Sequence, residues 1–175
     1  MRRRLLAGLG AVALVVAGYW FLVRDTTIEP TVRAPRAAAT IGSGSEAIAV
    51  GPRGGLLAWL PLAEDLQLPT LPLSEPPKSG HLAGPALQQA RVLGAAPPAL
   101  RPYLESSSYG ESGIDVKLRS GVELRFGDAS QATAKWKAAV AVLADPGVTT
   151  LDYVNLSAPG RPDVGGSGHT LPPVE

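Results

Sequence analysis

The residues that could carry catalytic or metal chemistry are few and lie far apart in the sequence. His81 lies in a proline-rich stretch and His169 in a glycine-rich one, and their spacing suits no metal site. The chain has no cysteine, which excludes thiolate nucleophiles and disulfides. Glu64, Asp65 and Asp115 are expected on surfaces or beside basic residues, so no general acid/base pair is visible. We predict a protein that is not an enzyme, with no catalytic, cofactor-binding or metal site.

The charge distribution narrows the class of partner. The 16 Lys and Arg residues nearly balance the 15 Asp and Glu residues, giving a net charge of +1. Apart from Arg2–Arg4 the basic residues are scattered, without the concentrated stripe that is typical of nucleic-acid binding. We therefore expect no nucleic-acid partner and no small-molecule substrate, which leaves proteins and a membrane.

The N-terminus has the pattern of a membrane anchor. Residues 5–23 carry no charge, and as a helix they would extend about 28 Å, close to a bilayer core of about 30 Å. Arg2–Arg4 precede this run, so residues 1–4 are expected to be cytoplasmic and the rest of the chain exported. A cleaved signal peptide, with Val16 and Gly18 near the cleavage site, is the competing interpretation.

The remaining chain predicts a single α+β domain. Residues 24–44 are interpreted as a linker and domain entry, residues 45–158 as an extracytoplasmic β domain, and residues 159–175 as a flexible tail. Ala47–Val50 and Leu56–Leu60 are expected to form a hairpin around a Gly-Pro turn. The fold class is then one transmembrane helix followed by a mixed β-sheet, with helices packed on one face of the sheet. Those helices are expected at residues 85–93 and 129–144, with a weaker candidate at residues 97–105.

A second hairpin is predicted by strict alternation of apolar and charged residues. A three-residue loop, Arg119–Gly121, sets apolar residues opposite one another and gives Gly121 a left-handed conformation. The expected pairs are Leu118 with Val122, Val116 with Leu124 and Ile114 with Phe126 on the apolar face, and Lys117 with Glu123 and Asp115 with Arg125 on the other.

The following helix is expected to pack on this hairpin. Asp128 is a suitable N-cap, Gln131 could complete a capping box, and Asp145-Pro146-Gly147 should end the helix. Trp136 belongs to an apolar stripe with Ala132, Ala139, Val140 and Leu143. Lys135 and Lys137 are expected on a solvated flank of the helix.

The final strand, residues 148–157, carries the candidate site. Because it follows a helical crossover, it should lie parallel to Val122–Phe126, and its far side should be an open sheet edge. An extended segment of another protein could add to such an edge, with Tyr153 as its aromatic anchor. The expected partner-binding residues are Leu151, Tyr153, Val154, Asn155, Leu156 and Ser157.

Several segments together resemble the FtsQ/DivIB cell-division family. The segments that carry the resemblance are Ser120–Asp128, Lys135-Trp136, Leu143–Pro146, Tyr153–Pro162 and the entry segment Val32–Ala38. The chain departs from the family pattern at two places. Only residues 24–31 occupy the position of the family's POTRA domain, and Asn155 stands where Asp is more usual.

The resemblance implies a divisome scaffold in the bacterial inner membrane, with a single membrane span. Such a protein would bind FtsB- and FtsL-like bitopic partners through its β domain and support septum formation. The alternative is an anchored extracytoplasmic adaptor or sensor domain unrelated to division, which would share only the β-rich architecture.

Overall fold

The computed structural model describes residues 36–62 and 67–170. The predicted anchor, residues 5–23, lies outside these ranges. None of the helices within them is long and apolar enough to cross a membrane. Within these ranges the predicted fold class is corrected to an α+β domain with a mixed sheet and helices, without a transmembrane helix.

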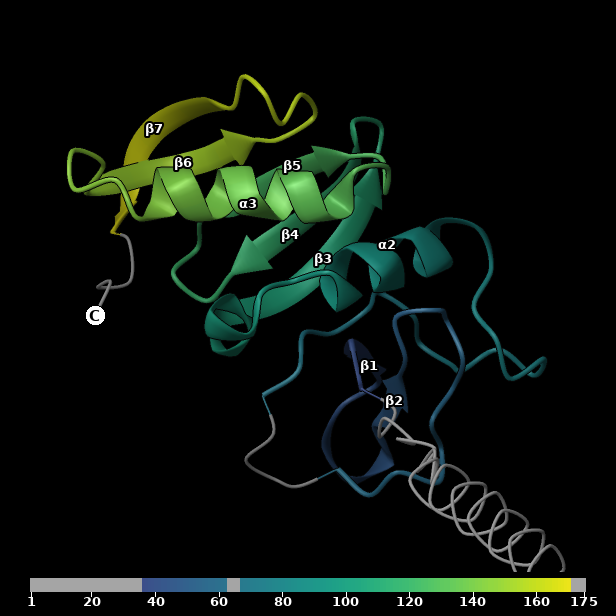
Figure 1. The fold of residues 1–175 in the computed structure, drawn as a ribbon. Helices are drawn as coiled ribbons and strands as arrows, with labels where there is room; N and C mark the ends of the chain where they lie inside the picture. Colours follow the sequence, from purple (N-terminus) through teal and green to yellow (C-terminus); the bar gives the residue numbers. More distant parts are fainter. Residues whose placement is uncertain (1–35, 63–66, 171–175) are drawn as a thin grey trace, which may run out of the picture. The chain divides into compact units, whose positions relative to one another are not determined.

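The centre of the domain is a five-stranded mixed sheet (Figure 1). Its strands are adjacent in chain order: β3 (Leu104–Gly110), β4 (Gly113–Leu118), β5 (Glu123–Gly127), β6 (Thr150–Asn155) and β7 (Asp163–Thr170). The pair β5–β6 is parallel, as the helical crossover between them predicts, and the other pairs are antiparallel.

The predicted register of the β4–β5 hairpin is confirmed for most of its length. Val116 pairs with Leu124, and Leu118 N–H donates to the Val122 carbonyl at 2.8 Å across a loop in which Gly121 has φ +94°. The expected pair of Ile114 with Phe126 is wrong, because the register shifts there and Ile114 lies opposite Gly127. This bulge depends on glycine, since a Cβ on Gly113 would collide with the backbone of Gly127.

Two α-helices cover one face of the sheet, α2 (Gly84–Gly94) and α3 (Ala132–Leu143) (Figure 1). Trp136 of α3 is fully buried against Phe126, with ring centroids 4.9 Å apart, and its Nε1 donates to the Val92 carbonyl of α2 at 2.8 Å. The indole of Trp136 thus connects α3 both to the sheet and to α2. The prediction that Val140 belongs to the buried apolar stripe is wrong, because this residue is 39% exposed.

The start of α3 differs from the predicted capping box. The helix begins at Ala132, and its N-cap residue Gln131 has a left-handed backbone, with φ 51°, and makes no side-chain cap. Asp128 instead accepts hydrogen bonds from Ser130 N–H at 3.0 Å and Ser130 Oγ at 2.6 Å. The aspartate therefore organises the turn before the helix rather than the helix end itself.

The first part of the domain forms a smaller hairpin of β1 (Ala39–Ile41) and β2 (Ile48–Val50). The second strand predicted at residues 56–60 is absent, and only a bridge between Val50 and Leu56 is formed there. Two 3-10 helices complete the fold, η1 (Gly44–Glu46) and η2 (Pro98–Tyr103), and η2 occupies most of the weaker helical candidate.

Candidate interaction edge

The predicted site strand β6 is not at the border of the sheet. β7 pairs with it in antiparallel orientation, from Asn155 opposite Asp163 to Thr150 opposite Thr170. The expectation of an open edge at β6 is therefore wrong, and so is the expectation of a flexible tail over residues 163–170. The chain's own backbone occupies the position predicted for a partner.

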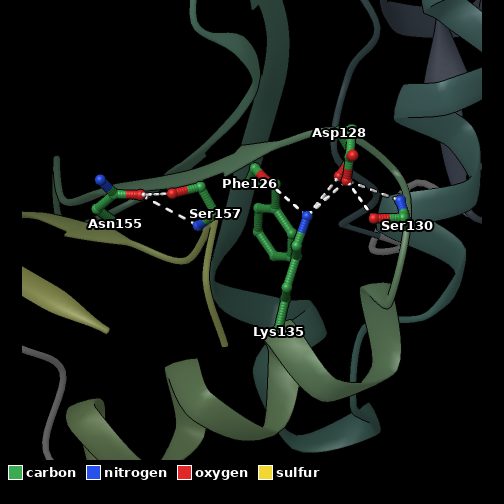
Figure 2. A network of polar contacts seen from close by, with 6 residues as sticks. All are labelled: Phe126, Asp128, Ser130, Lys135, Asn155 and Ser157. Atoms are coloured by element: carbon green, nitrogen blue, oxygen red, sulfur yellow. Dashed lines mark hydrogen bonds and ion pairs between the residues drawn. The ribbon is translucent and has the colours of Figure 1, made fainter. Parts of the chain in front are cut away.

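The six predicted partner-binding residues fall into two groups. Leu151, Val154 and Leu156 are buried core residues, so they cannot meet a partner while the domain is folded. Tyr153 and Asn155 are partly buried, and only Ser157 is exposed. Asn155 Oδ1 accepts hydrogen bonds from the N–H and the Oγ of Ser157 at 3.1 and 2.7 Å, which ends β6 in a tight turn (Figure 2).

The glycines of β7 explain why this segment can pack so closely on β6. A Cβ on Gly165 would lie 2.7–2.8 Å from the ring of Tyr153, and one on Gly168 would lie 2.6 Å from Asp152 Oδ1. Gly166 adopts φ +81°, and a Cβ there would collide with the Asp152 carboxylate. Residues 166–168 form a bulge opposite Asp152, whose Oδ1 accepts a hydrogen bond from Gly168 N–H at 2.8 Å.

The backbone of Val164 points away from the sheet. Leu156 N–H donates to the Arg125 carbonyl of β5 at 2.7 Å. Backbone groups alternate in direction along a strand, so those of Val154 also face β5. Those of Tyr153 and Asn155 then face β7. The backbone N–H and C=O groups of Asp163 and Gly165, which lie opposite Asn155 and Tyr153, therefore face β6. Val164, opposite Val154, must direct its N–H and C=O outward, and its side chain is 43% exposed.

The opposite edge of the sheet, at β3, is partly closed by the chain itself. Thr70 N–H donates to the Glu105 carbonyl, and Thr70 accepts from Ser107 N–H, both at 3.0 Å. On its other side Thr70 bridges to Thr40 of β1, so the first half of β3 is continuous with the small hairpin. Among the described strands, β7 is the edge that borders the predicted residues Tyr153 and Asn155.

The sheet face opposite the helices is polar. Arg125 forms an ion pair with Glu123 at 2.9 Å on the same strand, and its guanidinium lies 4.0 Å from the centroid of the Tyr153 ring. The predicted pairings of Lys117 with Glu123 and of Asp115 with Arg125 are confirmed in the register. Among the described residues, however, the side chains form other ion pairs: Lys117 lies 3.7 Å from Glu105, and Arg125 bonds Glu123. Burial, followed by the nearby Glu123, raises the pKa of Asp115, and Asp115 Oδ1 has no hydrogen-bond partner among the described residues.

Lys135 is buried rather than solvated, contrary to prediction. Its Nζ donates to the Phe126 carbonyl at 2.8 Å, the Asp128 carbonyl at 3.1 Å and Asp128 Oδ1 at 2.7 Å. These bonds lower the pKa of Asp128 to about 2, with Lys135 as the largest cause and Ser130 next. The network fixes the chain between the end of β5 and α3.

The described residues contain no group of three or more His, Cys, Asp or Glu side chains placed to hold a metal ion. The β7 edge and the side chains beside it form the candidate site. Compared with known proteins, the sequence matches no protein-family model and no curated protein.

Proposed function

We propose that this domain is a non-enzymatic protein-recognition module of the FtsQ/DivIB type, which serves as a divisome scaffold and binds FtsB- or FtsL-like partners. The proposal rests on the sequence resemblance and on one structural observation, the outward-facing backbone of Val164. An extended partner segment would pair with β7, not with β6 as the sequence predicted. The exported location predicted from the N-terminal residues lies outside the described part of the chain and stays a prediction.

The free backbone groups of β7 can set the register of a partner strand, but they supply only a small part of the binding free energy. Pro162 lacks an N–H and residues 166–168 bulge, so Val164 is the residue between them that offers both an N–H and a C=O. Two backbone hydrogen bonds contribute about 1–3 kcal/mol, whereas a micromolar complex needs about 8 kcal/mol. Side-chain contacts must supply the difference.

Side chains suited to this lie on both faces of the sheet beside Val164. The Val164 side chain is on the helix-covered face, because its partner Val154 shares the buried face with Leu124. Tyr153, stacked with Arg125, lies on the polar face. A partner strand with alternating apolar and polar residues could contact Val164 with one set and the Tyr153 side chain, which lies over Gly165 of β7, with the other.

The test is a proline substitution at Val164, which removes the outward N–H and no hydrogen bond to β6. We expect Val164→Pro to leave the melting temperature nearly unchanged and to abolish binding of an FtsB-like exported segment, measured by isothermal titration calorimetry. Val164→Thr keeps the N–H and should bind as the native chain does. Asp163→Pro removes an inward N–H and should lower the melting temperature as well.

Undiminished binding by a folded Val164→Pro variant would refute the edge assignment. Failure of the native chain to bind any FtsB- or FtsL-like segment, or to rescue a strain depleted of a full-length FtsQ/DivIB protein, would leave the alternative of an adaptor unrelated to division.

A further inference from the structure

A groove separate from the β7 edge lies between the end of α2 and the outer side of α3. Its volume is about 560 Å³, and its walls are the segment Gly94–Pro98, Arg36, Arg101 and the α3 residues Thr133, Trp136, Lys137 and Val140. Most of this lining is apolar or small. The groove is thus shaped to receive apolar side chains and is bordered by charge.

The charge at the groove has one sign. Arg36, Arg101 and Lys137 line it, and none of the described lining residues is acidic. Within residues 36–62 and 67–170 none of the three takes part in an ion pair. Arg101 is held in place, since its Nε donates to the Ala96 carbonyl at 3.1 Å. Burial, and then the neighbouring Arg36, lowers the pKa of Arg101, so an anionic group would relieve repulsion already present.

The outer face of α3 has little charge for a helix that faces solvent. Its exposed residues Thr133, Ala134, Val140 and Ala141 are small or apolar, and Lys137 is its one charged member. A helix on a domain surface normally presents charged and polar residues there. Ala134 and Ala141 would also allow a second helix to approach closely.

We propose that this groove and the outer face of α3 bind an acidic amphipathic helical segment of another protein. Apolar side chains of the segment enter between Val140 and the Gly94–Pro98 wall, and its carboxylates meet Arg36, Arg101 and Lys137. A helix about 10–12 Å across fits a concave groove, whereas the flat surface of a bilayer does not reach the groove floor. The site is independent of β7, so it stands or falls separately from the proposed function.

The experiment uses the full chain and designed peptides of about 16 residues. The first peptide has leucines at helical spacing i, i+3, i+7 flanked by glutamates. The second replaces its glutamates with lysines, and the third replaces its leucines with alanines. We expect the first to bind, with amide shift changes confined to Arg36, α3 and residues 94–101, and the other two to bind at least about tenfold more weakly.

Matched variants locate the site. Lys137→Glu and Val140→Asp should each weaken binding of the first peptide about tenfold without a change in circular dichroism. Lys78→Glu, an exposed lysine outside the groove, and Val164→Asp, an exposed valine on β7, should leave its affinity unchanged.

Three results would overturn the proposal. One is failure of the acidic peptide to bind, and another is equal binding of the lysine peptide. The third is displacement of the acidic peptide by phosphatidylcholine vesicles that contain phosphatidylglycerol, but not by phosphatidylcholine alone, which would assign the surface to anionic lipid instead.

Discussion

Lys135 and Asp128 form a pair whose structure differs from the sequence prediction, which placed Lys135 in solvent and Asp128 at the helix N-cap. A lysine next to a buried tryptophan on a helix is usually expected to reach solvent, yet Lys135 is 2% exposed. Three oxygens from Phe126 and Asp128 compensate its burial. The sequence offered one sign of this, an aspartate two turns before the lysine, but that spacing equally suits an N-cap.

This pair predicts a pH dependence of stability. The pKa of Asp128 is lowered from 3.8 to about 2, so its contribution is fully present above pH 4 and is lost as pH falls toward 2. Asp128→Asn should reduce the free energy of unfolding at neutral pH by about 1 kcal/mol, because the carboxylate is 67% exposed and screened. Urea unfolding across this pH range measures the effect.

Lys135→Met is the control, since it removes the largest cause of the lowered pKa and should flatten the same pH step. Identical acid profiles for the native chain and Asp128→Asn would contradict the assignment.

Among the elements, the β4–β5 hairpin could be predicted and β7 could not, for a physical reason. The hairpin is encoded locally, by alternation of large apolar and charged residues around Gly121. β7 has no such alternation, and its strand conformation comes from backbone pairing to β6, with glycines that make room for Tyr153 and Asp152. Glycine-rich composition alone indicates flexibility. That these glycines allow close packing on β6 is therefore visible only in the structure.

The β7 bulge predicts a strong dependence on Gly166. Gly166→Ala should lower the free energy of unfolding by more than about 1–2 kcal/mol, because φ +81° disfavours a Cβ and the new atom collides with Asp152. Thermal unfolding measures the loss. Gly160→Ala is the matched control, since a Cβ there meets nothing within 4 Å and φ is not positive. A Gly166→Ala variant as stable as Gly160→Ala would contradict the bulge conformation.

At the scale of the whole domain, β7 covers β6. This makes β6 an interior strand instead of an edge strand that could pair with other chains. Without it, β6 would expose an unpaired ladder flanked by Leu151, Tyr153 and Val154, the kind of edge that pairs indiscriminately with other chains. The bulge and small side chains of β7 give the sheet a shorter border instead. The domain can then offer one defined docking residue, Val164, without inviting aggregation.

Shortening the chain tests this role. A chain that ends at Pro162 should unfold at lower urea concentration than one that ends at Thr170, by about 2 kcal/mol or more, because several inter-strand hydrogen bonds are lost. It should also associate as concentration rises, which light scattering detects, while the longer chain does not. The difference between the two chains isolates β7. Equal stability and equal dispersity would mean that β7 neither holds the sheet nor protects β6, and the argument for Val164 as the docking residue would fail with it.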